Sequence, residues 1–355
     1  YWLLVLILMF FANTEMSLYL FIGSIVLYIL IYFYYTFKIR KRIVNKNISI
    51  NKMRITLVSI FVLAVLFLQF MRVDIWLLQP FINEIPTVGT TGVSISVDPQ
   101  NFVYTLTTEK DDFKILQLTD IHLGGSYYSL YKDKHALYAV YELIKYTEPD
   151  LVIVTGDLVF PLGIMSMSFN NKAPFMQFAA FMRNIGVPWV FAYGNHDTEQ
   201  VANYTAEEIN SLLASYSMHA KNLLYPYIQP SIYGRNNQML EIRNKEGKLM
   251  QALFILDSNS YTGEGLNEYD YIHDEQVNWY EQNIKELSKK EGYTVPSMLF
   301  FHIPLQEYEE AYQLYKEGSK EVTYHFGVVS EKNEGVAASN YPSKLFEKAV
   351  ELKST

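Results

Sequence analysis

The sequence contains no cysteine, which excludes disulfide bonds and any metal site built on thiolates. It is also poor in positive charge outside one short stretch. Residues 37–54 carry no acid and seven basic side chains, namely Lys38, Arg40, Lys41, Arg42, Lys46, Lys52 and Arg54. Without these seven, 22 of the 29 basic residues remain against 37 acidic ones, a net charge of −15. Such a surface disfavours contacts with a phosphate backbone, so no nucleic acid is expected as a partner.

Two stretches of the chain lack charge altogether. Residues 16–36 and 55–71 are uncharged and mostly apolar, and the first has the ~20 residues that a helix needs to cross a bilayer. Residues 1–12 indicate the end of an earlier span. A buried core helix or a signal peptide is the alternative, but spans in series around a basic connector favour transmembrane helices.

The basic connector predicts the orientation of these spans. Loops rich in lysine and arginine stay on the cytoplasmic side, so everything after about residue 72 is expected outside the cytoplasm. The sequence thus predicts a multi-pass protein of the cell membrane, with the lipid bilayer as a partner and an extracytoplasmic main domain. The first residue is Tyr1, which indicates a chain that begins inside a longer protein.

Three regions are expected from these patterns. Transmembrane helices fill 1–72 (about 1–12, 16–36 and 55–71), a linker with edge strands covers 73–110, and an α/β domain covers 111–355. In the last region, apolar runs predict strands at 113–119, 151–155, 187–193 and 297–301 and a hairpin at 239–243 and 249–256. Helices are expected near 132–147, 174–185, 205–214, 274–289, 306–317 and 342–353. This order favours a layered α/β domain with its helices outside.

Four of the predicted strands end in residues of types that can bind metals. In chain order these residues are Asp120, His122, Asp157, Asn195, His196, Asp197 and His302. Carboxylate, imidazole and amide ligands suit Fe, Mn or Zn, and the lack of thiolates points to a catalytic rather than a structural metal.

Taken singly, each position has a structural alternative. Asp157 could cap a helix, Asn195 could form a turn, and His302 could be a core histidine. Four such strand ends in one domain favour a shared site.

The series Asp-x-His, Gly-Asp, Gly-Asn-His-Asp and a strand-end histidine resembles the calcineurin-like metallophosphoesterase superfamily, in particular its purple-acid-phosphatase-like branch, over about residues 111–355. The resemblance implies a layered α/β/β/α sandwich with a two-metal centre of divalent or trivalent Fe, Mn or Zn. It also implies hydrolysis of phosphate mono- or diesters by a hydroxide that the two metals activate. The expected substrate is a phosphorylated small molecule or a lipid-linked phosphoester.

The resemblance also implies a role for each motif residue. Asp120 and His122 bind the first metal, Asp157 bridges both metals, and Asn195 and His302 bind the second. His196 lies beside the metals, where it protonates the leaving oxygen or stabilises the phosphoryl transition state. Asp197 orients His196.

Some features depart from the family pattern. A closing Gly-His-x-His motif with two further ligands is expected after Thr355. The other histidines (His135, His219, His273 and His325) do not follow strands, so solvated or capping roles are expected for them. Leu158, Val159 and Phe160 stand where a purple acid phosphatase has its coloured tyrosine, so a purple Fe(III) centre is not expected. Asp257 is expected in a turn or at a helix start.

Two alternatives remain open at this point. The domain could be a non-catalytic, membrane-anchored binding module on a degenerate phosphoesterase fold. It could also be an enzyme that faces inward and acts on cytoplasmic nucleotides.

Overall fold

The computed structural model describes residues 29–30, 32–34, 38, 52–72, 76–89, 92–162, 165–263, 268–325 and 335–355. Its named helices are α4 (Lys52–Phe70), α5 (Gln79–Glu84), α6 (Leu130–Thr147), α7 (Lys172–Ile185), α8 (Ala206–Ser217), α9 (Asp274–Glu291), α10 (Gln306–Lys316) and α11 (Leu345–Leu352). Its strands are β1 (Ser94–Val97), β2 (Tyr104–Thr108), β3 (Ile115–Leu118), β4 (Leu151–Thr155), β5 (Trp189–Ala192), β6 (Gln238–Asn244), β7 (Leu249–Ile255) and β8 (Ser297–Phe300).

Two β-sheets pack face to face in the centre of the domain. One has the strand order β1-β2-β6-β7-β8, and the other is the parallel sheet β3-β4-β5. Leu151 and Ile153 of β4 share a buried cluster with Leu253 and Ile255 of β7. The intervening Phe254 belongs to a different cluster, beneath α9. Because side chains alternate along a strand, each sheet buries one face against its partner and the other against helices.

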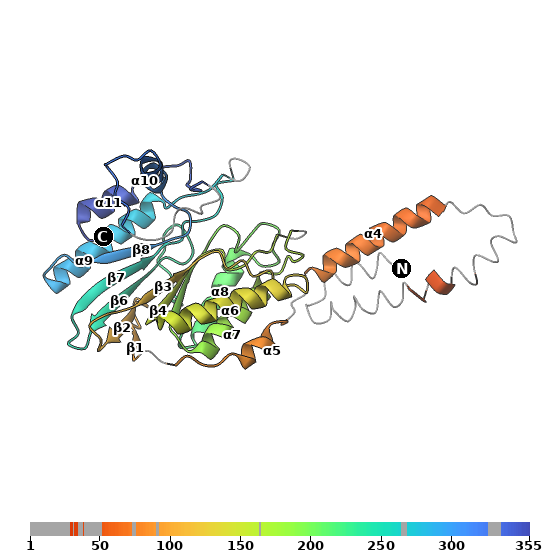
Figure 1. Cartoon of the computed structure of the whole chain (residues 1–355), viewed down its shortest axis with the longest axis horizontal. Coiled ribbons are helices and arrows are strands. Elements are labelled where there is room, and N and C mark those ends of the chain that lie inside the picture. The colour runs from red at the N-terminus through yellow and green to blue at the C-terminus, as the bar shows by residue number, and fades with distance from the viewer. Residues whose placement is uncertain are drawn as a thin grey trace.

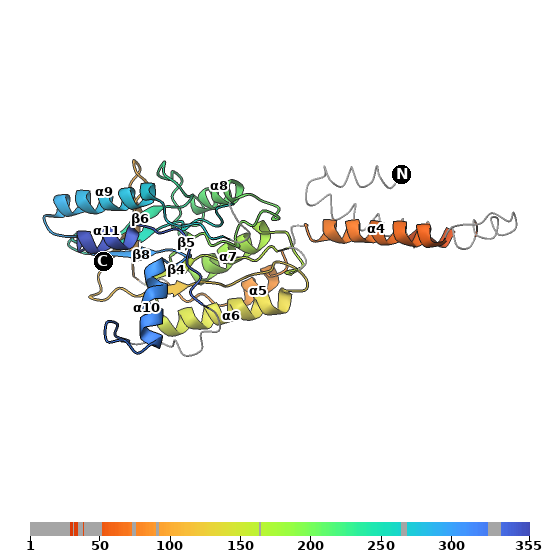
Figure 2. The same ribbon diagram turned by 90° about the horizontal axis from the view of Figure 1, so that it is seen from above.

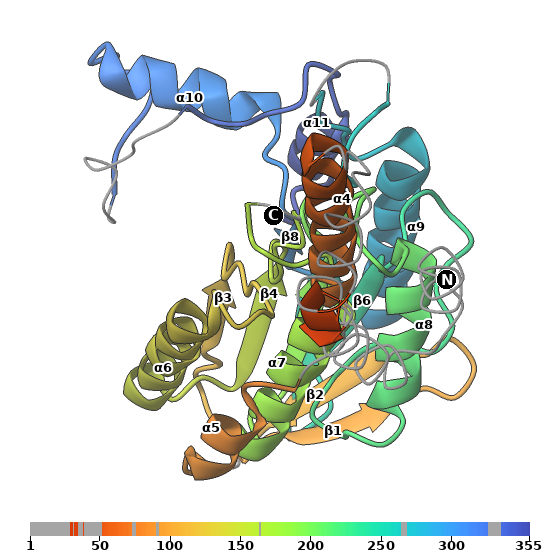
Figure 3. The same cartoon turned by 90° about the vertical axis from the view of Figure 1, so that its right-hand side faces the viewer.

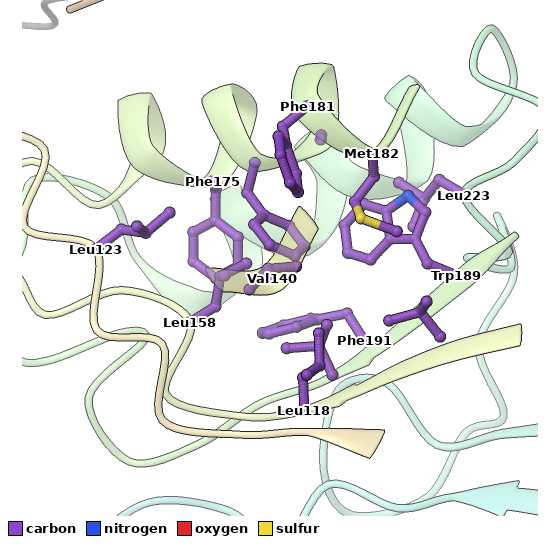
Figure 4. Packing of buried hydrophobic residues seen from close by; sticks show 14 of the residues in the cluster. Leu118, Leu123, Val140, Leu158, Phe175, Phe181, Met182, Trp189, Phe191 and Leu223 are labelled. Atoms are coloured by element: carbon purple, nitrogen blue, oxygen red, sulfur yellow. The ribbon is translucent and has the colours of Figure 1, made fainter. Parts of the chain in front are cut away.

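Helices cover the outer face of each sheet. Helices α5 to α8 pack on the three-stranded sheet, and α9 and α11 pack on the five-stranded one (Figures 1 and 3). Figure 4 shows Phe175, Phe181 and Met182 of α7 reaching toward Trp189 and Phe191 of β5. The expected order of helix, sheet, sheet and helix is confirmed.

The strands that end in polar motifs reach the same edge of the domain. β3, β4 and β5 are parallel, so their carboxyl ends lie together. Beyond these strands, His122 N–H donates to the Asp157 carbonyl at 2.9 Å, and Asp120 N–H donates to the Gly156 carbonyl at 3.2 Å. The His302 ring reaches this edge from the end of β8, where it contacts the Thr155 carbonyl. Segments far apart in the sequence therefore meet at one place.

The region 73–110 contributes to the folded domain. Strands β1 and β2 form at the end of the five-stranded sheet, as the sequence predicts. The short helix α5 was not expected. Leu78, Ile82 and Ile85 around it are buried in the same cluster as α7, and Leu78 N–H donates to Gln177 Oε1 at 2.7 Å. The segment is therefore anchored to α7 rather than being a free connector.

The predicted membrane spans receive no support from the described residues. The expected span 1–12 and almost all of 16–36 lie outside them. The third, 55–71, coincides with α4, which projects away from the layered domain (Figures 1 and 2). Across the part of the chain that the structure describes, no helix combines the length and the apolar character that a bilayer requires.

Candidate metal centre

Three of the predicted ligands have an unusual backbone conformation. Asp120, His122 and Asp157 adopt φ values of 56°, 53° and 50°, in the left-handed region that side-chain-bearing residues rarely occupy. All three directly follow strands β3 and β4. Backbone strain of this kind concentrates at functional sites, where surrounding structure holds it in place.

Two glycines allow the loops after β4 and β5 to touch. A Cβ atom on Gly194 would lie 2.2 Å from Asp157 Oδ1, and one on Gly156 would lie 2.6 Å from Gly194 N. Gly156 also has a φ of 91°. Any side chain at either position would force the loops apart, which explains why glycine precedes Asp157 and Asn195.

The Asp157 carboxylate lies at the centre of the predicted ligands. Its Oδ2 is 3.1 Å from His122 Nε2, 3.4 Å from His302 Nε2 and 3.9 Å from His196 Nε2. Two sets of side chains have ligand atoms close enough to hold an ion: His122, Asp157 and His196, and Asp120, Asp157 and His302. Asp157 is the member that both sets share, as a bridging carboxylate would be. Asp120 falls into the set with His302, and its Oδ1 also lies 3.8 Å from Nε2 of His122, the residue with which the sequence analysis paired it.

The His302 ring is held in one orientation. With Nδ1–H donating to the Thr155 carbonyl at 2.9 Å, Nε2 faces Asp157 and lies 3.2 Å from Asn195 Oδ1. A hydrogen bond of this kind on the far ring nitrogen is typical of metal-binding histidines. Burial lowers the pKa of His302, but the hydrogen bond and charge of Asp157 outweigh it and raise the pKa to about 9.

The charge balance of the site favours a bound cation. Burial raises the pKa of Asp157, but hydrogen bonds from His122 and His302 outweigh it and hold this pKa well below its usual range. The Asp157 carboxylate thus stays ionised and keeps a proton on the His302 ring. A metal ion satisfies the same negative charge once that proton leaves. The donor set therefore fits the metal centre that the resemblance implies.

His196 is oriented by a glutamate rather than by Asp197. Its Nδ1 lies 2.6 Å from Glu199 Oε1, and its Nε2 faces Asp157. The predicted contact between Asp197 and the His196 ring is absent from the described residues. The two consecutive side chains point apart, since Asp197 is fully buried behind the loop.

Asp197 instead binds three backbone amides. Its Oδ2 accepts from Asp157 N at 2.9 Å and Gly194 N at 2.7 Å, and its Oδ1 accepts from Val159 N at 3.0 Å. Burial and the nearby Asp157 charge raise the pKa of Asp197, while the Gly194 and Val159 amides partly offset this. Asp197 therefore ties the loop after β4 to the loop after β5.

Three residues around the site were missed from sequence. Glu199 lies three positions after His196, which is a weak signal within a turn. Tyr261 accepts a hydrogen bond from Asn195 Nδ2 at 3.0 Å and has a pKa raised to about 12, chiefly by burial. Asp133 accepts from the amides of Gly124 and Gly125, each at 3.0 Å, and so fixes the loop after His122. Neither Tyr261 nor Asp133 stands in a local motif.

The structure also shows the surroundings of Phe160, His273 and Asp257, for which the sequence analysis had expectations. The Phe160 ring packs 5.1 Å from the His122 ring and 4.8 Å from the His196 ring, so this position offers no oxygen ligand. His273 caps α9 and pairs with Asp270 at 2.8 Å. Asp257 forms a turn by accepting from Asn259 N at 2.9 Å.

The chain is similar to several known proteins. Among solved structures, a dimetal phosphatase from Danio rerio matches with 12% identity and a TM-score of 0.34, covering 54% of this chain and 70% of that one. The chain is 29% identical over 227 residues to probable inactive purple acid phosphatase 14 of Arabidopsis thaliana (55% of this chain, 54% of that protein). It is 29% identical over 254 residues to phosphatase DCR2 of Saccharomyces cerevisiae (67% of this chain, 41% of that protein).

The chain thus spans about half the length of these curated relatives or less. The sequence profile of the family described as "Calcineurin-like phosphoesterase" matches residues 113–329, more than half of the chain. On this match, the chain belongs to the calcineurin-like phosphoesterase family.

Proposed function

We propose that this protein is a metal-dependent phosphoesterase that hydrolyses phosphate mono- or diesters. The observation that carries the proposal is the position of Asp157, whose carboxylate is common to both sets of potential metal ligands. In this proposal Asp120, His122, Asp157, Asn195 and His302 hold two ions of Fe, Mn or Zn. Two such cations lower the pKa of a water molecule and neutralise charge on the phosphoryl group.

The residues beside the ligands supply the remaining chemistry. His196 Nε2 faces the centre while Nδ1 is held by Glu199, so the ring is placed to donate a proton to the leaving oxygen. Phe160 packs against the rings of His122 and His196 and keeps water from that side of them. Asp197 and the glycines of the two loops fix the distances between ligands.

Metal content and turnover together test this proposal. Elemental analysis of the purified protein should find about two equivalents of Fe, Mn or Zn. An activity assay should find metal-dependent hydrolysis of p-nitrophenyl phosphate. Asp157→Asn should lose both. The exposed Asp112→Asn, away from the site, is the matched control and should lose neither. Unchanged turnover in Asp157→Asn would refute the assignment.

A second candidate is a non-catalytic binding module on the same fold. It is favoured by the name of the Arabidopsis relative, which calls that protein probably inactive. It predicts protein that hydrolyses no phosphoester, and metal-free protein under conditions that load related enzymes would favour it. The yeast relative is named a phosphatase, which favours the enzyme.

Membrane attachment and an extracytoplasmic site are further proposals, and they depend on the sequence alone. Their support is the uncharged stretch 16–36 and the basic connector 37–54. Residues 1–355 contain no cysteine, so a cysteine introduced at Asp112 would be the only thiol among them. Labelling of that thiol in intact cells by a membrane-impermeant reagent is expected. Labelling only after lysis would favour the inward-facing enzyme and its cytoplasmic nucleotides.

A further inference from the structure

The loop that follows β7 supplies none of the predicted metal ligands but contacts two of them. We call residues 257–261 the β7 loop. Because β7 and β8 are parallel, their carboxyl ends lie together, and the β7 loop lies beside the segment that carries His302. The loop also contacts Asn195, which follows β5 of the other sheet. In the proposed metal centre, Asn195 and His302 are the ligands that belong to the second ion alone.

Asn195 is held at both its backbone and its side chain. Ser260 Oγ donates to the Asn195 carbonyl at 3.1 Å, and Asn195 Nδ2 donates to the Tyr261 hydroxyl at 3.0 Å. With Nδ2 turned to Tyr261, the amide Oδ1 faces the centre and lies 3.2 Å from His302 Nε2. A hard metal ion binds an amide side chain through its oxygen. The β7 loop therefore holds Asn195 in the orientation that metal binding requires.

The second partner of the Tyr261 hydroxyl determines which way the Asn195 amide faces. The hydroxyl has one proton, and its oxygen lies 3.4 Å from Glu199 Oε1. An ionised carboxylate only accepts hydrogen bonds, so the hydroxyl gives its proton to Glu199 and accepts one from Asn195. A flipped amide would place Oδ1 against a hydroxyl that has no proton left to donate. The contact thus disfavours the orientation in which Asn195 turns its nitrogen toward an ion.

The same loop holds the backbone of the segment that carries His302. Ser258 is fully buried, and its Oγ accepts from the N–H of Ile303 at 2.8 Å. Ile303 directly follows His302, so this bond fixes the backbone from which the His302 ring projects. The ring itself is oriented by the Thr155 carbonyl, at 2.9 Å from Nδ1. Backbone and ring of His302 are therefore held by different elements, and the β7 loop holds the backbone.

The β7 loop is itself anchored to the structure behind it. The buried Asp257 carboxylate accepts from Asn259 N at 2.9 Å. Asn259 has a φ of 65°, and its Nδ2 donates to the Tyr271 carbonyl at 2.7 Å, which ties the loop to the segment before α9. The Tyr261 ring stacks on the Tyr269 ring with centroids 5.7 Å apart. A group that orients a ligand is effective only when its own position is fixed, and these contacts fix it.

We propose that the β7 loop positions the ligands of the second metal ion, with Tyr261 and Ser258 as its positioning residues. This inference rests on the metal centre of the proposed function and adds residues that are not themselves ligands. Tyr261 directs the oxygen of Asn195, and Ser258 fixes the backbone at His302, so both ligands depend on one loop. Among the described residues, no hydrogen bond joins this loop to His122, a ligand assigned to the first ion. Loss of the loop contacts should therefore weaken one ion and spare the other.

Retention of zinc at graded concentrations tests the proposal. Zinc-loaded full-length protein is dialysed against buffers of graded free Zn²⁺, and elemental analysis of the retained metal gives two dissociation constants. In Tyr261→Phe and in Ser258→Ala, one of these constants should rise about 10- to 100-fold, the usual cost of removing a group that orients a metal ligand. The other constant should stay at its wild-type value.

Two matched variants control for the loss of a hydroxyl elsewhere in the domain. Tyr293→Phe removes a tyrosine hydroxyl that donates to the carbonyl of Leu249, at the opposite end of β7 from the metal centre. Ser217→Ala removes a buried serine hydroxyl that donates to the Tyr225 carbonyl at 2.8 Å, in the segment after α8. Both controls should keep the two dissociation constants of the wild-type protein, even where they lower its melting temperature.

Double variants identify the ion that is affected. Asn195→Ala removes the ligand that Tyr261 orients, so adding Tyr261→Phe to it should weaken zinc binding no further. His122→Ala removes a ligand of the other ion. Adding Tyr261→Phe to His122→Ala should therefore weaken the remaining site by the same factor as in the wild-type protein. A full additional loss in the Asn195→Ala background would overturn the inference.

Zinc retention is measured without turnover, so it separates this inference from the proposed function. Protein that retains two ions and responds to Tyr261→Phe as expected, but does not hydrolyse p-nitrophenyl phosphate, would defeat only the proposed function. Wild-type retention by Tyr261→Phe and Ser258→Ala would overturn the inference and leave the proposed function standing. Equal weakening of both ions, as a general structural role of the loop predicts, would also overturn it, as would a wild-type protein that retains fewer than two ions.

Discussion

Replacing Asp197 with alanine should destabilise the protein strongly, although this residue touches neither the His196 ring nor solvent. The change removes both oxygens that accept from the amides of Asp157, Val159 and Gly194. Each buried amide left without an acceptor costs about 1–3 kcal/mol. Three of them total about 3–9 kcal/mol, and water that enters the vacated space recovers part of this. We expect a net loss of about 3 kcal/mol, a large share of the 5–15 kcal/mol typical of a folded domain.

Urea unfolding followed by tryptophan fluorescence measures this loss. Trp189 is fully buried at the start of β5, the strand that leads into the loop of residues 194–197, and should report unfolding of the domain. The urea concentration at the midpoint of unfolding should fall, while the slope of the free energy of unfolding against urea concentration stays the same. The control is Asp112→Ala, an exposed aspartate whose replacement should change stability by less than about 0.5 kcal/mol. The free energy of unfolding of Asp197→Ala could instead lie within about 1 kcal/mol of the wild-type value, about a fivefold change in the folding equilibrium. In that case the amide contacts do not hold the loops and the reasoning is wrong.

Three further changes have defined outcomes. Glu199→Gln removes a charged partner from the His196 ring and should lower kcat about 10- to 100-fold without loss of metal. The loss should be greater for an alkyl phosphate than for p-nitrophenyl phosphate, since only the poorer leaving group needs the proton. Equal losses of kcat for the two substrates would contradict this role. Hydrogen bonds from Lys285 and Lys348 lower the pKa of Glu281. The ionised Glu281 side chain therefore stabilises the folded protein above the ordinary carboxyl pKa, and this stabilisation disappears as the pH falls through the lowered pKa. Glu281→Gln should therefore lower the melting temperature slightly at pH 7 and have no effect at strongly acidic pH, which thermal scans at both pH values check. Chelation of the metals should lower the melting temperature, because an ion that binds only the folded protein stabilises it, and added metal should restore it; a scan unaffected by chelator would argue against a loaded site.

The layers of the fold were predictable because burial leaves a direct mark on the sequence. Residues 151–155 are apolar except for the final threonine, and the structure buries every one of them in β4. The amphipathic pattern near 274–289 likewise becomes α9, whose apolar face covers the five-stranded sheet. Helix α5 could not be predicted in this way. It is six residues long, too short to show a period, and its burial depends on contacts with α7 nearly 100 residues away.

The meeting of the predicted ligand residues at one edge was predictable for a different reason. Parallel strands share an edge, so polar residues that follow strands meet there whatever their separation in the sequence. The partners of those ligands were not predictable. Tyr261 reaches Asn195 across 66 residues, from a loop whose path no local pattern determines. The role of Asp197 depended on which way one turn directs two consecutive side chains, and that direction follows from the tertiary contacts of the loop.

The contacts of Asp197 also explain how the strained ligand loops persist. Left-handed backbone at Asp120, His122 and Asp157 costs about 1–3 kcal/mol at each position. The loop after β4 meets this cost through the amides of Asp157 and Val159, both of which bind the buried Asp197 carboxylate. That carboxylate also holds Gly194, whose missing side chain lets Asp157 approach. Asp197, the fourth residue of the Gly-Asn-His-Asp motif, therefore holds the loop that carries Asp157, while Glu199 hydrogen-bonds to the ring of His196.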